Sequence, residues 1–196
     1  TFFSVNVYLG VRRDLAAEPS ALIMLLDTPV TIAGHEGDHL EMQIYGFDRT
    51  MAPAGKGVIK VELVSKYSYW KALAADRGKY EEEKARVSEQ VIGLVGRRFP
   101  GIGAQVETVD VTTQLTWERY MGGTHGFANL PNRKATVWSG IKGTGGDLTL
   151  PGLEDFYFAG VWSSLSGSLF GNALSGRRAV RAICKKAGKP FHRSGS

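Results

Sequence analysis

Two histidines four residues apart, His35 and His39, are the residues whose types and spacing most directly suggest chemistry. The segment 35–39 reads HEGDH, which matches the zinc-protease signature H-E-x-x-H. On a helix, residues i and i+4 share one face, so the two imidazoles could bind one zinc ion while Glu36 activates a water molecule. The signature therefore requires a helix at residues 35–39.

The residues around this motif favour strands instead of a helix. Gly34 and Gly37 lie before and inside it, and each glycine costs about 1 kcal/mol of helix stability relative to alanine. The flanking segments 29–34 and 39–47 are β-branched or alternate apolar with polar residues. The other two histidines of the chain are distant in sequence and suggest no third ligand. We expect residues 35–39 to form the polar tip of a β-hairpin without metal, with a zinc hydrolase as an alternative that zinc content would test.

Composition limits the class of protein. The chain has 196 residues, of which 43% are hydrophobic and 22% charged, as in ordinary globular domains. The longest apolar run, residues 21–26, is far shorter than the roughly 20 residues that a membrane helix needs. The single cysteine, Cys184, excludes an internal disulfide and is compatible with a reducing compartment. We expect a cytoplasmic protein, with peripheral contact to a membrane left open.

The net charge of +5 would favour an anionic partner, such as a phosphate-bearing cofactor. The basic residues gather mainly in residues 176–193. No arginine-rich stripe with interleaved aromatic residues recurs along the chain. We therefore expect no nucleic-acid partner.

The order of strand and helix patterns predicts an α+β fold. Strand patterns occupy residues 2–10 and 21–27, the hairpin, and residues 57–65, and a further strand is expected at 104–113. Their connections are too short for helical crossovers, so the sheet should be mainly antiparallel. Helices are expected at 69–78 and 79–99. The longer one should cover the sheet with an apolar face that consists of Val87, Val91, Leu94 and Val95.

The C-terminal segment combines a strand pattern, a turn rich in small residues and a helix. Residues 155–160 read as a short buried strand, and residues 171–186 read as a helix. Ala173, Ser175 and Gly176 lie in the first turns of that helix. Free N–H groups and the positive end of the helix dipole would face an anion or a flat ring there, with little side-chain obstruction.

Five segments resemble, in the same order, flavoproteins that desaturate, saturate or isomerise polyenes. These are the phytoene desaturases, carotenoid isomerases and retinol saturases of the amine-oxidase-like superfamily. The similarity covers nearly the whole chain, and its final segment is the most specific. The segments are 4–11, 47–61, 79–102, 111–123 and 153–184.

The resemblance implies two parts and a cofactor. Residues 1–150 would form a substrate-binding domain, and residues 151–196 a strand–turn–helix segment of an FAD-binding domain. The flavin of FAD would exchange hydride with, or isomerise, a hydrophobic polyene such as a carotenoid or retinoid. A helix N-terminus beside the flavin pyrimidine ring would stabilise the negative charge of reduced flavin. The implied cofactor-binding residues are Gly160, Val161, Gly167, Ser168, Leu169, Asn172 and Ala173.

The resemblance also implies that FAD is bound by the full-length protein and not retained by these 196 residues. The glycine-rich loop for the FAD diphosphate would belong to an N-terminal half. The chain has no Gly-x-Gly-x-x-Gly that follows a strand and opens a helix. Its start at Thr1, directly on an apolar β-rich run, also suggests a domain cut from a longer protein. We expect the fragment alone to be inactive.

Two features depart from the family pattern: the residue after Gly160, and the turn at residues 166–173, which in relatives is richer in glycine and often has a proline near the helix start. Relatives commonly have Glu, Asp or Gln immediately after the Ala-Gly that ends at Gly160, and this chain has Val161. A non-enzymatic lipid- or polyene-binding domain on the same scaffold is therefore an alternative. A reducible yellow chromophore in the full-length protein would separate the two functions.

Overall fold

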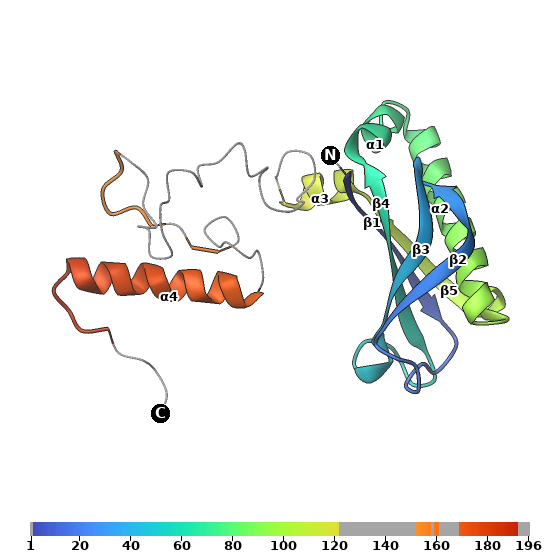
Figure 1. Ribbon diagram of the computed structural model, residues 1–196, viewed down its shortest axis with the longest axis horizontal. Helices are drawn as coiled ribbons and strands as arrows, with labels where there is room; N and C mark the ends of the chain where they lie inside the picture. Colours follow the sequence, from blue (N-terminus) through green and yellow to red (C-terminus); the bar gives the residue numbers. More distant parts are fainter. Residues whose placement is uncertain (1, 122–151, 158, 161–168, 192–196) are drawn as a thin grey trace. The chain divides into compact units, whose positions relative to one another are not determined.

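The computed structural model describes residues 2–121, 152–157, 159–160 and 169–191 (Figure 1). The chain forms two compact units, Thr1–Ala128 and Asn129–Ser196. Each unit is described by itself.

The first unit contains a five-stranded antiparallel sheet in the order β2-β3-β4-β1-β5. Its antiparallel pairing and short connections confirm the predicted α+β class. The strands predicted at 2–10, 57–65 and 104–113 lie within two residues of their predicted bounds, whereas β3 begins four residues before the predicted segment 39–47. The strands are β1 Phe2–Val11, β2 Ala21–Ile32, β3 His35–Ile44, β4 Gly57–Lys66 and β5 Val106–Thr112.

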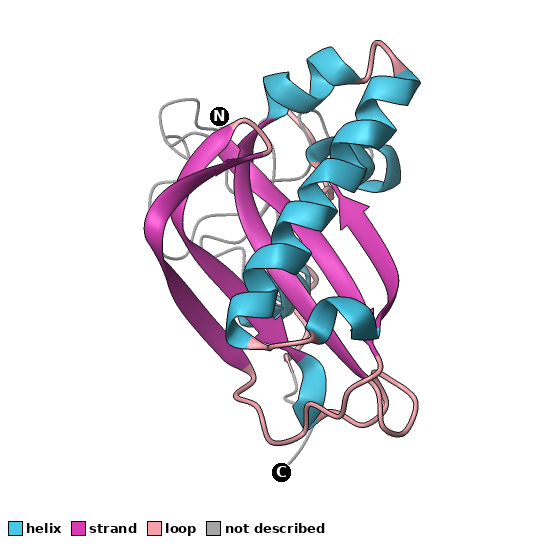
Figure 2. Ribbon diagram, turned by 90° about the vertical axis from the view of Figure 1, so that its right-hand side faces the viewer, coloured by secondary structure: helices cyan, strands magenta, loops and turns pink. Residues whose placement is uncertain are grey.

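Helix α2, Arg77–Arg98, covers one face of this sheet (Figure 2). Asp76 caps it by accepting hydrogen bonds from the amides of Gly78 and Lys79, which satisfies two of the free N–H groups of its first turn. The predicted apolar face, Val87, Val91, Leu94 and Val95, is buried as expected. Shorter helical elements are η1 Tyr45–Phe47, α1 Tyr67–Leu73, η2 Ile102–Gln105 and α3 Gln114–Met121.

The alternation of the strands decides which side chains meet α2. On β1, Val5, Val7, Leu9 and Val11 are at most 1% exposed and join the same core as the apolar face of α2. Their register partners on β4 are buried on that side too. Successive strand residues point to opposite faces. Residues between these positions therefore form the other face, which is mainly polar.

The β2–β3 hairpin departs from the rest of the sheet near its tip. The turn consists of Ala33 and Gly34, both with positive φ (52° and 69°). The Ser65 hydroxyl on β4 donates to the Ala33 carbonyl at 2.6 Å and accepts from the Trp70 indole N–H at 3.1 Å. Both Ser65 and Trp70 are fully buried. This short chain of hydrogen bonds fixes the hairpin tip to β4 and α1.

Two local predictions were wrong. Residues 35–39 are not the hairpin tip but the first half of β3, because Ala33 and Gly34 already supply the positive φ values that a tight turn requires. The described residues of 155–160 are not in a strand. Asp155 and Gly160 have φ of 56° and 98°, which extended backbone does not allow.

Replacing the linking serine by alanine should destabilise the first unit. In Ser65→Ala the buried Trp70 N–H loses its acceptor, which should cost about 1–3 kcal/mol of unfolding free energy. Urea unfolding of the variant and the parent chain measures this cost. The matched control is Ser88→Ala, which removes a serine that bonds the Ala85 carbonyl on the exposed side of α2; an equal loss in both variants would contradict the assigned role of Ser65.

Candidate functional site

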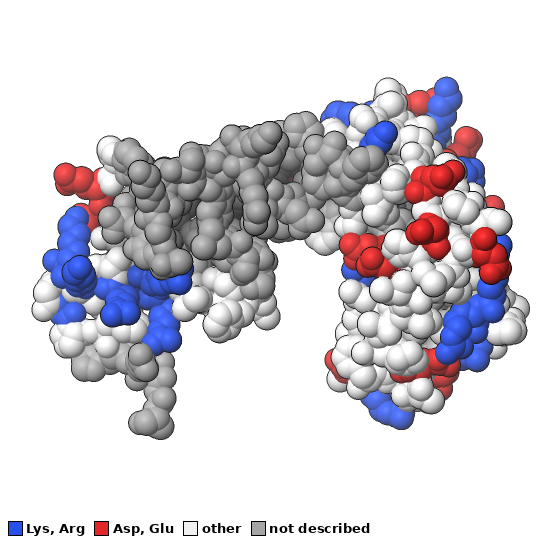
Figure 3. All heavy atoms as spheres, in the orientation of Figure 1, with Lys and Arg blue, Asp and Glu red and all other residues white. Residues whose placement is uncertain are grey.

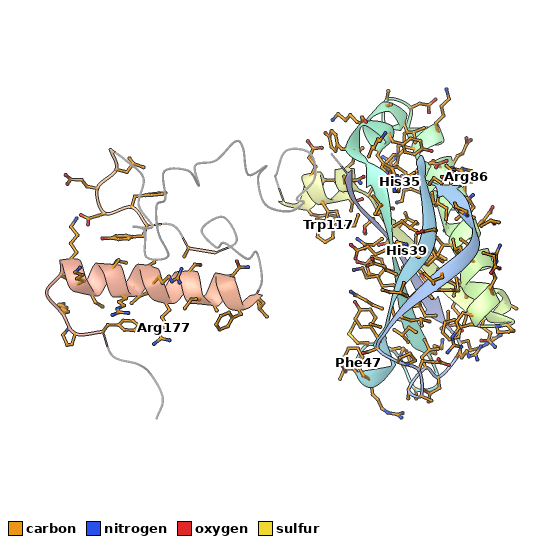
Figure 4. The ribbon with its side chains drawn as sticks, in the orientation of Figure 1. His35, His39, Phe47, Arg86, Trp117 and Arg177 are labelled. Carbon is orange, nitrogen blue, oxygen red and sulfur yellow. The ribbon has the colours of Figure 1, made fainter. Side chains whose placement is uncertain are left out.

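The two histidines of the HEGDH segment lie on one strand and cannot share a metal ion. Because β3 is extended, His35 and His39 are separated by about 13 Å along the strand. Figure 4 shows the two residues at separate places along β3. Among the described residues, no group of three His, Cys, Asp or Glu side chains could hold a metal. The geometry therefore gives no support to the zinc alternative.

His39 instead belongs to a small charged cluster on the surface. Its Nδ1 lies 2.7 Å from Asp38 Oδ1, and its Nε2 lies 3.7 Å from Glu41 Oε1. The hydrogen bond to Asp38 raises the pKa of His39 above its ordinary value of 6.5. The same hydrogen bond lowers the pKa of Asp38. The imidazole therefore holds its proton more strongly than a free histidine does.

Removing the Asp38 carboxylate should lower the pKa of His39. Because the pKa of His39 is raised in the folded protein, the pairing of His39 with Asp38 stabilises the fold below the pKa of the unfolded state. This stabilisation is lost as the pH rises through the folded pKa. In Asp38→Asn the titration midpoint of His39, followed by NMR of the ring, should fall toward the ordinary value. Glu36→Gln, a change on the same strand, should leave that midpoint unchanged. A His39 midpoint that is the same in Asp38→Asn and the parent chain would disprove the pairing.

In the second unit, one hydrogen-bonded serine connects Gly160 with helix α4, Leu169–Lys186. The Ser175 hydroxyl accepts from the Gly160 amide at 2.7 Å and donates to the Asn172 carbonyl at 2.6 Å. Ser175 is 3% exposed. The segment that ends at Gly160 is thereby attached to the first turns of α4.

Asn172 has an unusual environment in the first turn of α4. Its Oδ1 is buried and has no hydrogen-bond partner among the described residues. Buried side-chain acceptors are nearly always satisfied in proteins. The orphaned oxygen therefore marks a place where a donor from a ligand or another segment would be favourable.

The remaining predicted cofactor residues divide into two groups. Leu169 is the first residue of α4 and is 88% exposed, and Ala173 is also exposed. Gly160 has φ of 98°, with open space where a Cβ would lie, so a larger residue there would be strained by backbone conformation and not by a clash. Val161, Gly167 and Ser168 lie outside the described residues.

The sequence did not single out Ser175 as a site residue. It was noted only as one of several small residues in the helix, because its spacing from Gly160 carries no pattern. The sequence feature that could have indicated its role is the spacing of three residues between Ser175 and Asn172, a predicted cofactor-binding residue. Serine in a helix often bonds the carbonyl one turn back, and here the same oxygen also accepts from another segment.

The surface of α4 is divided into three rows. Asn172, Ser175 and Ala179 face the interior of the second unit at i, i+3 and i+7 spacing. An exposed apolar row consists of Leu169, Ala173, Val180 and Ile183. Figure 3 shows Lys and Arg side chains gathered along α4, and these are Arg177, Arg178, Arg181, Lys185 and Lys186.

Comparison with protein-family models and with curated protein sequences finds no match for this chain. Within the described part of the chain, no helix has the length and apolar character to cross a membrane.

Proposed function

We propose that this chain is the C-terminal part of an FAD-dependent oxidoreductase of the phytoene-desaturase type. The substrate would be a hydrophobic polyene such as a carotenoid or retinoid, and the reaction a desaturation, saturation or isomerisation. The observation that carries the proposal is the attachment of Gly160 to the start of α4 through Ser175. Both residues belong to segment 153–184, which is the most specific segment of the resemblance.

The residues at this place suit the pyrimidine edge of a flavin. The orphaned Oδ1 of Asn172 is an acceptor for a ring N–H. The amides of the first turn of α4 have no partner within the helix and carry its positive dipole end. When bound, FAD supplies hydride exchange with the substrate. The role of this chain is to hold one edge of the ring and to stabilise negative charge on it.

Exposed apolar side chains of the second unit support a hydrophobic substrate. Leu169 and Phe170, at the start of α4, are 88% and 77% exposed. Leu153 and Phe156 are 49% and 44% exposed. Burying such side chains against an apolar ligand is favourable at about 25 cal/mol per Å² of apolar surface. A polyene offers an apolar surface of this kind next to the flavin edge.

The proposal includes a cytoplasmic location with peripheral membrane contact, because a long polyene partitions into lipid. The apolar row of α4 beside its basic residues is consistent with a helix at an anionic membrane surface. The second candidate function is a non-enzymatic lipid- or polyene-binding domain. Val161, which replaces the polar residue of the family pattern, favours that alternative.

Loss of the linking serine should weaken FAD binding by the complete protein that carries these residues. Ser175→Ala removes the acceptor of the Gly160 amide, and the dissociation constant should rise about tenfold, equivalent to about 1.4 kcal/mol. Fluorescence titration of the apoprotein with FAD measures the effect. Ser88→Ala, whose serine makes the same type of bond to a carbonyl three residues earlier, should bind FAD like the parent protein.

A change at Asn172 separates a role at the flavin from a structural role. Asn172→Asp keeps an acceptor but adds negative charge, so the reduced, anionic flavin should be destabilised and the midpoint potential lowered. The potential is measured by anaerobic reduction with a reference dye. Normal FAD affinity and an unchanged midpoint potential in Asn172→Asp would place the flavin elsewhere. If the complete parent protein binds a polyene but no FAD, the second candidate function is favoured.

A further inference from the structure

Strand β2 forms an edge of the sheet, and among the described residues no strand lies beyond it (Figure 1). The Ser20 carbonyl accepts a hydrogen bond from the Ile44 amide at 2.9 Å, which fixes the start of the β2–β3 ladder. The backbone groups of an antiparallel strand point alternately toward its partner and away from it. Those of Ala21, Ile23 and Leu25 therefore point away from β3, to the open edge of the sheet.

The side chains of the same part of β2 are apolar on both faces of the sheet. Ile23 and Leu25 are 64% and 79% exposed. Leu22, Met24 and Leu26 pack against the core on the other face, but each is only half-buried. A strand added at this edge would pair the outward backbone groups and cover apolar surface on both faces. Both gains favour strand addition.

The two edges of the sheet differ in charge. On β2, residues 21–26 include no charged side chain, and Asp27 and Pro29 follow them. The opposite edge strand, β5, has the exposed acidic residues Glu107 and Asp110. Charged residues and proline on an edge strand discourage pairing with another chain. Residues 21–26 are therefore the part of the two edges that is most open to another strand.

The sequence of this run suits a second copy of the same chain. A two-fold axis brings the same surface of two copies together. In an antiparallel pair centred on Ile23, this residue faces its own counterpart, and Ala21 faces Leu25 of the other copy. The outward backbone groups of all three residues are then paired. A charge in this run would lie near the same charge of the other copy and repel it, and the run has none.

We propose that β2 pairs along residues 21–25 with β2 of a second copy of this chain, so that the two sheets become one continuous sheet. The acidic residues of β5 protect the opposite edge, so assembly ends at the dimer. The paired run is short and the interface lies below the about 1,200 Å² of stable complexes, so the dimer is weak and reversible. The surface belongs to the first unit, and the proposal does not rest on the proposed flavin function.

Sedimentation equilibrium of the 196-residue chain tests this dimer. The apparent mass should rise toward that of a dimer as the chain concentration increases from about 1 μM to about 1 mM, the range of weak complexes. Ile23→Lys places an ammonium opposite its own copy and should abolish this rise. Val64→Lys is the matched control, because Val64 is 48% exposed on the same face but lies on the interior strand β4. It should associate like the parent chain.

Four results of this experiment would overturn the proposal. They are a constant monomer mass of the parent chain, growth beyond the dimer, a dimer that survives Ile23→Lys, and an equal loss of association in Val64→Lys.

Opposite charges at position 23 test the two-fold pairing itself. Ile23→Lys and Ile23→Glu should each remain monomeric when alone. An equimolar mixture of the two variants should form a heterodimer, because unlike charges then face each other across the axis. A mixture that remains monomeric overturns the pairing centred on Ile23.

Amide hydrogen exchange followed by NMR identifies the backbone groups that pair. The amides of Leu22 and Met24 point toward β3 and should exchange slowly at low and high chain concentration. The amides of Ala21, Ile23 and Leu25 should exchange fast in dilute chain and slowly in concentrated chain. Exchange of these three amides that does not depend on concentration overturns the proposal. Their protection by an added extended peptide in a chain that stays monomeric would assign the edge to a different partner and also overturn it.

Discussion

The packing of the apolar stripe of α2 against one face of the sheet is the interaction on which the first unit depends. It requires Val5, Val7 and their neighbours in register to point one way. The alternation of strands then sends Asn6, Glu41 and Glu62 to the opposite face. A shift of one residue in register would exchange the two sets. The polar row on the second face is therefore a consequence of the hydrophobic core on the first.

The outer half of the β2–β3 hairpin is held by a second set of contacts, which involve its tip. Its tip is bonded to Ser65 and lies against α1, where Tyr69 faces Gly34. Glycine is required at this point because its φ is positive and a Cβ would collide with the Tyr69 ring. Beyond Glu41, β3 no longer pairs with β4. A hollow lined by residues of β2, β3 and β4 lies where these strands separate.

The sequence was sufficient to predict the strands, the antiparallel arrangement and the buried face of α2, because each depends on a local pattern of apolar residues. It was insufficient where structure depends on partners far away in the chain. The attachment of the β2–β3 hairpin tip to β4 and α1 depends on Ser65 and Trp70, and neither residue type predicts such a contact from the sequence. The apolar run at 155–160 had the composition of a strand, but the positive φ at Asp155 and Gly160 leaves that segment irregular. The role of Ser175 could not be predicted from the sequence, because it depends on a contact with Gly160 on another segment of the chain.

The central functional claim is that α4 begins at the edge of a flavin ring in the complete protein. The most direct measurement is the anaerobic visible spectrum of that protein, purified and incubated with FAD, during stepwise reduction with dithionite. The account predicts one protein-bound flavin per chain, bleached on reduction and released on unfolding, while the 196-residue chain alone stays colourless. A complete protein that acquires no flavin absorbance would contradict it.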